Sequence, residues 1–315
     1  MTRLLIADIG GTHVRFAMAD HTGLHDAQTL LVADFPGPLE AVDAYLKNHA
    51  RPSRAVFAVA GPVGGDRFEL TNFPWIFSVS GLSARLGFDV TLINDFHAQA
   101  LAIPVLAADR VVKLGGGDAT PGGPIGVMGP GTGLGVAMLV HDGHRYMAVP
   151  GEGGHVTLPV VSPREAAIRD WLLAHKYSHV SAERVCSGKG LLNLYAAIRA
   201  LDGRDLPDRS PEDITARAMT GACDTCVECL DLMLGFLGRV AGNLALTAGA
   251  LGGVYLTGGI LPRLGAAYLE GSRLRAEFVA KGRHRGYMDA IPLFLVNDPL
   301  LGLQGLRQYG LDTLA

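Results

Sequence analysis

Two stretches of the chain, LLIADIGGTHVRFAM (residues 4–18) and IGVMGPGTGLGVAM (residues 125–138), follow the same plan. Each has a short apolar run, a glycine-rich turn and a second apolar run, which predicts two antiparallel strands joined by a tight turn. Gly-Thr and Ala-Met recur at the same spacing, beginning at Gly11 in the first stretch and at Gly131 in the second. Because the match lies in the same strand–turn–strand context, we infer an internal duplication.

Two halves that each open with a glycine hairpin imply two lobes with a cleft between them. Further strands are expected at 55–60 and 90–93, with a helix starting near Phe96, and this alternation favours an α/β fold. The hairpin tips suit a phosphate chain, because glycine allows close backbone approach and threonine adds a hydroxyl donor. An ordinary tight turn is the alternative for either hairpin alone. The sequence has no P-loop motif and no Gly-x-Gly-x-x-Gly after the first strand.

Composition narrows the class of protein. The chain has 315 residues, 49% of them hydrophobic, which favours two domains over a single core. The net charge of −3 offers no basic excess for a phosphate backbone, so nucleic-acid binding is not expected. No basic and apolar leader opens the sequence, and we expect a cytoplasmic protein. The uncharged stretch 240–261 is almost long enough to span a membrane, but its glycines and polar residues predict a buried helix followed by a buried strand.

Three of the four cysteines, Cys223, Cys226 and Cys229, are three residues apart. Their neighbours suggest one continuous helix over 213–237, in which these thiols share one face. Free cysteine behaves as a small hydrophobe, and no fourth ligand follows with zinc-site spacing. We therefore predict buried thiols and no metal site.

Three segments outside the hairpins carry candidate chemistry. Asp95 ends a predicted strand, where it could accept a proton from an attacking hydroxyl, or simply cap the next helix. Asn94 beside it makes a pair suited to a polyol. The segment 151–155 reads Gly-Glu-Gly-Gly-His, which predicts a hydrogen-bonding loop for hydroxyls, with a solvent loop as the alternative. Glu183 is unremarkable by itself, and a surface ion pair with Arg184 would explain it.

Taken in order, six motifs resemble the bacterial glucokinase family, of the sugar-kinase/actin ATPase superfamily. The resemblance extends from Leu4 to about Gln308, and although each motif alone is weak, six in order are specific. The motifs lie at residues 8–12 (DIGGT), 93–96 (INDF), 131–135 (GTGLG), 150–155 (PGEGGH), 181–185 (SAERV) and 257–260 (TGGI).

The resemblance implies a two-lobed actin-like ATPase fold, related to ribonuclease H, and phosphoryl transfer from ATP, carried with Mg²⁺, to O6 of glucose. It implies that Asp95 is the general base and that the sugar is bound by Asn94, Asp95, Glu152, His155 and Glu183. Nucleotide contacts are implied for Ala7, Asp8, Ile9, Gly10, Gly11, Thr12, Gly131, Thr132, Gly133, Gly258 and Gly259, with Asp8 orienting the metal-bound waters.

The resemblance further implies a homodimer and a C-terminal helix, roughly 302–309, that returns to the small lobe. We accordingly expect a small lobe at 1–105 plus about 297–315 and a large lobe at 106–296. Two positions depart from the family pattern: His13 stands where asparagine is common, and Pro130 where a small residue is common. After His155 the chain has no cysteine, so we place it outside the zinc-containing repressor-type branch.

Several alternatives remain open at this point. A sugar sensor would place a DNA-binding helix-turn-helix before the first strand, which begins at Leu4. An actin-like filament protein would not need the Asn94, Glu152, His155 and Glu183 set, and an acyl-phosphate kinase would need cationic clamps. Polyphosphate or ADP as donor, and a broader hexose range, are also compatible with the sequence.

Overall fold

The computed structural model describes residues 3–61, 63–70 and 75–313. The chain forms two compact units, Met1–Leu106 with Asp298–Ala315 (unit 1) and Ala107–Asn297 (unit 2). The lobe boundaries expected from the sequence lie one residue before each of these.

Unit 1 is built on a five-stranded sheet in the order β3-β2-β1-β4-β7. β1, β2 and β3 form an antiparallel meander, and β4 and β7 continue the sheet parallel to β1. A small hairpin, β5-β6, stands apart from this sheet. The strands are β1 (Leu4–Ile9), β2 (His13–Asp20), β3 (Gly23–Leu31), β4 (Arg54–Val59), β5 (Arg67–Glu69), β6 (Ile76–Ser78) and β7 (Asp89–Asn94).

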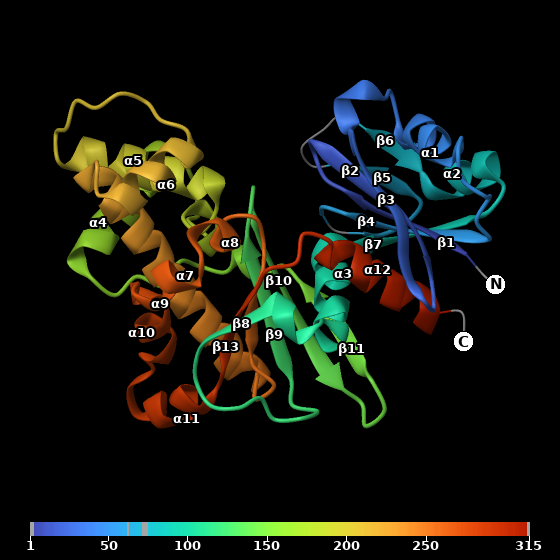
Figure 1. Ribbon diagram of the computed structural model, residues 1–315. Coiled ribbons are helices and arrows are strands. Elements are labelled where there is room, and N and C mark those ends of the chain that lie inside the picture. The colour runs from blue at the N-terminus through green and yellow to red at the C-terminus, as the bar shows by residue number, and fades with distance from the viewer. Residues whose placement is uncertain (1–2, 62, 71–74, 314–315) are drawn as a thin grey trace. The chain divides into compact units, whose positions relative to one another are not determined.

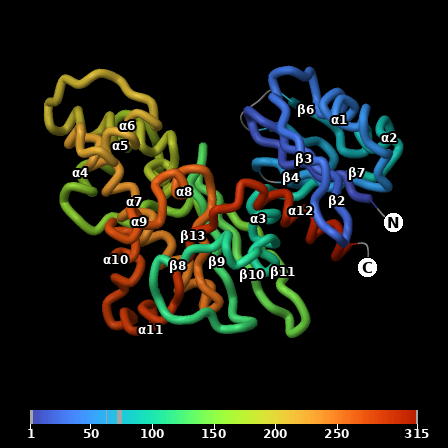
Figure 2. Tube along the Cα trace, in the orientation of Figure 1, coloured from blue at the N-terminus to red at the C-terminus, as the bar shows by residue number. Residues whose placement is uncertain are grey.

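Alternate residues of β1 enter two different cores. Leu5, Ala7 and Ile9 join the core that α1 and α2 cover, whereas Leu4 and Ile6 pack with residues of α3 and α12. Figures 1 and 2 show the red C-terminal helix α12 beside α3, and α12 belongs to the same compact unit as residues 1–106. The helices are α1 (Pro38–Leu46), α2 (Val79–Leu86), α3 (Asp95–Ala102) and α12 (Leu301–Asp312), with short 3-10 turns η1 (Val32–Asp34) and η2 (Ile103–Val105).

Unit 2 contains a six-stranded sheet in the order β11-β10-β9-β12-β13-β8. β9, β10 and β11 are antiparallel, β12 and β13 run parallel to β9, and β8 closes the edge antiparallel to β13. The strands are β8 (Val111–Gly115), β9 (Ile125–Pro130), β10 (Leu134–His141), β11 (Tyr146–Gly151), β12 (Val254–Leu256) and β13 (Leu293–Val296).

One large apolar core joins this sheet to the helices of unit 2, with the long helix α7 at its centre. The α-helices are α4 (Pro163–His175), α5 (Gly188–Leu201), α6 (Pro211–Thr220), α7 (Asp224–Ala248), α8 (Leu261–Leu264), α9 (Ala266–Glu270), α10 (Arg273–Val279) and α11 (Arg285–Ala290). Short 3-10 turns are η3 (Ala108–Arg110), η4 (Gly153–His155), η5 (Ala182–Arg184) and η6 (Gly282–His284).

The two sheets repeat the same arrangement. Each begins with an antiparallel three-strand meander and continues with two strands parallel to the first one, so β1-β2-β3-β4-β7 corresponds to β9-β10-β11-β12-β13. The sequence echo falls on equivalent hairpins, β1-β2 and β9-β10. The structural repeat and the α/β class expected from the sequence are therefore confirmed.

The predicted helix over 213–237 was wrong. Gly221 has a left-handed backbone (φ 68°) that ends α6, and Cys223 is the N-cap of a separate helix, α7. Cys226 and Cys229 are buried as expected, whereas Cys223 is only partly buried. Glycine tolerates this conformation without a Cβ clash, which explains the break.

The uncharged stretch 240–261 is not one helix. α7 ends at Ala248, and the short buried strand β12 follows after a glycine turn, as expected from the sequence. Within the described residues, α7 is the one helix long and apolar enough to cross a membrane. Because 78% of its most apolar window is buried inside the chain, α7 has the character of a core helix.

Candidate active site

The first glycine hairpin joins β1 to β2 in unit 1. Its turn is closed by the Gly10 amide, which donates to the carbonyl of His13 at 3.0 Å. Ala7 and Ile9 are buried in the core, so these two positions offer backbone rather than side chains. Thr12 and His13 are exposed at the tip, and the His13 that departs from the family pattern is the first residue of β2. The tip therefore presents backbone groups, the Thr12 hydroxyl and the His13 ring, and the backbone groups and hydroxyl are what a phosphate site requires.

Asp8 is the acidic group of this hairpin. It pairs in the strand register with Arg15, whose guanidinium lies 3.4 Å from the carboxylate. Burial raises the pKa of Asp8, and Arg15 offsets only part of that rise. The side chain still keeps 27% of its surface exposed. A Cβ at Gly302, in the first turn of α12, would lie 3.3 Å from Asp8 Oδ2, so glycine leaves room for this carboxylate.

Asn94 and Asp95 mark the junction of β7 and α3. Asn94 is the N-cap: its Oδ1 accepts from the amides of Phe96 (2.8 Å) and His97 (3.1 Å), and its Nδ2 donates to the carbonyl of Gly61 at 3.1 Å. Asp95 is the first helical residue, and its Oδ1 accepts from the Phe96 amide at 2.9 Å. The helix-capping role that the sequence allowed for Asp95 is thus filled mainly by Asn94. One of the two Nδ2 hydrogens of Asn94 is not used by these bonds.

The second glycine hairpin, in unit 2, joins β9 to β10 and includes Gly131, Thr132 and Gly133. The Gly131 amide donates to the carbonyl of Gly133 at 2.8 Å, which closes the turn. Glu183 lies against this turn, because its Oε2 accepts from the amide of Leu134 at 3.0 Å. The ion pair with Arg184 that the sequence left open is not found among the described residues. The carboxylate is instead committed to the hairpin.

The loop that carries Glu152 and His155 packs on the base of the same hairpin. Its last three residues form the 3-10 turn η4, and a Cβ at Gly154 would collide with the carbonyl of Leu134. The glycine is thus required for this close approach. Glu152 Oε2 lies 3.8 Å from His155 Nε2, and 63% of the Glu152 side chain and 55% of the His155 side chain are exposed. That distance is too long for a hydrogen bond, and no hydrogen bond to either side chain occurs in the described part of the chain, so both are open to a ligand.

The Thr257–Gly259 turn follows β12 and lies against the start of the second hairpin. The Thr257 amide donates to the carbonyl of Met128 at 2.8 Å. Gly258 has φ +83°, and a Cβ there would lie 2.5 Å from the Pro130 carbonyl oxygen. The Thr257 hydroxyl is buried without a hydrogen-bond partner. The expected nucleotide segments of unit 2 are therefore adjacent.

Each unit thus gathers its own share of the expected residues. Unit 1 holds the first hairpin and the Asn94–Asp95 junction, on strands β1, β4 and β7 that are neighbours in one sheet. Unit 2 brings together the second hairpin, the 152–155 loop, Glu183 and the 257–259 turn. No cluster of three or more His, Cys, Asp or Glu side chains suited to a metal occurs among the described residues.

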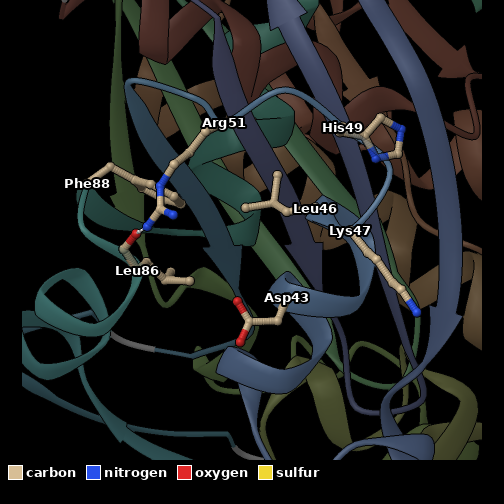
Figure 3. A pocket seen from close by; sticks show the side chains of 7 residues that line it. All are labelled: Asp43, Leu46, Lys47, His49, Arg51, Leu86 and Phe88. Atoms are coloured by element: carbon tan, nitrogen blue, oxygen red, sulfur yellow. Dashed lines mark hydrogen bonds between the residues drawn. The ribbon is translucent and has the colours of Figure 1, made fainter.

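A hollow of about 310 Å³ lies elsewhere in unit 1 (Figure 3). It is lined by Asp43, Leu46, Lys47, His49, Arg51, Leu86 and Phe88. Figure 3 shows Arg51 reaching toward Leu86, whose carbonyl accepts its hydrogen bond. None of the expected site residues lines this hollow, so it is separate from the candidate active site.

Sequence reasoning missed two residues that hold the site. Arg15 would have been found from the hairpin register, which places it opposite Asp8. Ser187 is the N-cap of α5, and its hydroxyl donates to the Glu183 carbonyl at 2.8 Å. The Ser-Gly-Lys-Gly pattern ahead of the apolar helix was a capping signal, but its link to Glu183 is tertiary.

Comparison with known proteins gives a consistent result. A family model described as Glucokinase matches residues 5–312. A glucokinase of Nitrobacter hamburgensis is 43% identical over 317 residues, covering 99% of this chain and 98% of that protein. A solved glucokinase from an Antarctic psychrotroph has a TM-score of 0.86 at 37% identity, with 98% of each chain covered.

A more distant solved structure, glucokinase from Balamuthia mandrillaris in complex with glucose, has a TM-score of 0.82 at 23% identity. It covers 98% of this chain and 93% of its own, and at that identity it speaks for the fold alone. These likenesses confirm the two-lobed actin-like ATPase fold that was expected from the sequence.

Proposed function

The chain belongs to the glucokinase family, and we propose that it transfers the γ-phosphoryl group of MgATP to the 6-hydroxyl of glucose. The products are glucose 6-phosphate and ADP. The observation that carries this proposal is the grouping in unit 2. The Glu183 carboxylate and the loop with the exposed Glu152 and His155 side chains both contact the glycine-threonine hairpin. Groups suited to binding a phosphate and groups suited to binding a polyol, held together in one unit, are what a sugar kinase needs.

Asp95 is the proposed general base. It accepts the proton of the sugar 6-hydroxyl as that oxygen attacks the γ-phosphorus. Its Oδ1 accepts from the Phe96 amide at the first turn of α3. That bond and the positive end of the helix fix the carboxylate in place, and a fixed acceptor lowers the entropic cost of reaching the reactive geometry.

Glucose hydroxyls are the proposed partners of Asn94, Glu152, His155 and Glu183. Asn94 contributes its remaining Nδ2 hydrogen, because its Oδ1 is occupied by the helix cap. Glu152 supplies a carboxylate acceptor and His155 a ring nitrogen, and both are exposed to solvent when no sugar is bound. These groups come from both units, so the proposal includes closure of the units around the sugar, which would also exclude water as a competing nucleophile.

The two hairpins are the proposed phosphate clamps, through Ala7–Thr12 in unit 1 and Gly131–Gly133 in unit 2, with Gly258 and Gly259 near the adenosine. Asp8 is the proposed partner of the metal-bound waters. Its partly exposed carboxylate can accept hydrogen bonds from the waters that Mg²⁺ usually keeps when it is bound. When bound with the nucleotide, Mg²⁺ neutralises charge on the β- and γ-phosphates.

A coupled assay tests this proposal. Glucose, mannose, fructose and glucosamine are each offered with MgATP, ADP or polyphosphate, and phosphorylated sugar is measured for every pair. For glucose, glucose-6-phosphate dehydrogenase reports whether the phosphoryl group is on O6. We expect MgATP and glucose to be the best pair. Failure to phosphorylate any hexose with any donor would contradict the proposal.

We also propose that the enzyme is cytoplasmic and acts as a homodimer. Light scattering on the purified protein measures the oligomeric state directly, and a monomer at micromolar concentration would contradict the second statement.

A further inference from the structure

The backbone of the second hairpin rests on one acidic side chain. The amide of Leu134, the first residue of β10, donates to Glu183 Oε2 at 3.0 Å, across 49 positions of sequence. A Cβ at Gly133 would lie 2.5 Å from the same oxygen. The carboxylate is therefore packed directly against the Gly133–Leu134 backbone, at a place where only glycine leaves room for it.

The other end of the hairpin is held by the same segment. The amide of Gly188 donates to the carbonyl of Gly131 at 2.9 Å. Ser187 links these two anchors, because its hydroxyl donates to the Glu183 carbonyl at 2.8 Å and accepts from the Gly190 amide at 2.9 Å. Both ends of the hairpin tip are thus fastened to the 183–190 segment, which is itself fixed by the start of α5.

No other hydrogen bond or ion pair to the Glu183 carboxylate is found among the described residues. One oxygen holds the hairpin, which leaves Oε1 for a further donor. A sugar hydroxyl on Oε1 would restrain the carboxylate in the position that holds Leu134. A well-ordered hairpin would in turn favour the carboxylate position that the sugar needs. Each ligand would then lose less ordering entropy when the other is present.

We propose that Glu183 is a positioning residue for the phosphate hairpin as well as a sugar ligand, and that it couples the two substrates. This inference rests on the proposed function for the identity of the ligands. Coupling of this kind is reciprocal, so glucose and nucleotide should raise each other's affinity by the same factor. A hydrogen bond to a charged group is strong enough for an effect of about tenfold or more.

The experiment measures nucleotide binding without chemistry. Calorimetric titration with the Mg²⁺ complex of adenosine 5′-(β,γ-imido)triphosphate is run with and without saturating glucose. Without glucose, Glu183→Ala should bind the analogue about tenfold more weakly than wild type. Glu183→Gln should stay within about threefold, because its amide oxygen can still accept from Leu134. Glu183→Asp keeps the charge but is one methylene shorter, and should behave like the alanine variant.

Glu152→Ala is the matched control. It removes another proposed sugar carboxylate that has no bond to the hairpin, so it should weaken glucose binding and leave sugar-free nucleotide binding unchanged. Without glucose, wild type and Glu152→Ala should therefore bind the analogue equally well, and Glu183→Ala more weakly. Near wild-type affinity of Glu183→Gln would show that position 183 can be substituted without loss of the fold. All these variants should bind glucose more weakly, because each removes, neutralises or displaces a proposed sugar carboxylate.

Two outcomes would overturn the inference. Equal sugar-free affinity of wild type and Glu183→Ala for the analogue would show that Glu183 does not position the hairpin. That result would leave the proposed function intact. Wild-type protein that binds neither glucose nor the analogue would instead overturn the proposed function, and the coupling with it.

Discussion

Replacing Gly305 with alanine tests how α12 supports the proposed base. Gly305 lies in α12 where that helix crosses α3, and a Cβ there would lie 2.5 Å from the carbonyl carbon of Ala98 and closer still to its oxygen. Carbon atoms pack best at about 3.5–4.0 Å. Because the clash is with the backbone of α3, no side chain can move aside, and the two helices must separate by more than about an ångström.

The net effect follows from two opposing contributions. Alanine gains about 1 kcal/mol over glycine in a helix interior. Overpacking costs about 1–3 kcal/mol and sometimes more, and a backbone-on-backbone clash belongs at or beyond the upper end. We expect a loss of about 2 kcal/mol, which lowers Tm by roughly 8 °C for a domain of this size. Since α3 begins with Asp95, kcat should also fall, by about tenfold or more.

Gly310→Ala is the matched control on the same helix. Its Cβ would lie 2.6 Å from Leu4 Cδ1, the end of a flexible side chain that can rotate away. Calorimetric melting and the coupled kinase assay on both variants give the comparison, with Gly310→Ala within about 1 kcal/mol of wild type. A Gly305→Ala protein that melts and turns over like wild type would refute the seating of α12 on α3.

Three further predictions concern the rest of the chain. Arg239 donates to buried Glu165 at 2.7 Å, and replacing it with methionine should lower the free energy of unfolding in urea by about 3–5 kcal/mol. A decrease under about 1 kcal/mol would show that the pair is dispensable. Burial lowers the pKa of His97, so as pH falls below about 6.5 the unfolded chain binds that proton before the folded chain does. The free energy of unfolding should therefore decrease with falling pH until the folded-state pKa is reached. His97→Gln should lose this part of the pH dependence, and a pH profile identical to that of wild type would contradict the prediction. Saturating glucose should reduce the radius of gyration in small-angle scattering at unchanged oligomeric state, and an equal radius with binding verified would show that no closure occurs.

Local patterns predicted the elements that depend on neighbouring residues. The hairpins at Gly10–Thr12 and Gly131–Gly133 follow from alternating apolar runs and glycines, and β1 has the expected bounds, Leu4–Ile9. The repeat of the sheets was visible because both hairpins kept their Gly-Thr and Ala-Met pairs. The return of α12 to unit 1 came from the family resemblance alone, since nothing within 302–309 indicates its packing partner.

Tertiary contacts explain what could not be predicted. The contact between Glu183 and Leu134 joins residues 49 positions apart, and neither residue type suggests it. The break at Gly221 was missed because its flanking residues continue a helical pattern, and only the left-handed backbone shows that α6 has ended. Asn94 and Asp95 are both good caps, so sequence could not tell that Asn94 takes that role and leaves Asp95 at the first helical position.

The Asp95→Asn variant tests the central claim most directly. Asparagine keeps the shape of the side chain and an Oδ1 that can accept from the Phe96 amide, as Asp95 does at 2.9 Å, so the fold and glucose binding should persist. The proton acceptor is lost, and kcat at saturating glucose and MgATP should fall by about 10²–10⁴-fold. A folded, glucose-binding variant that keeps more than about a tenth of the wild-type kcat would show that Asp95 is not the general base.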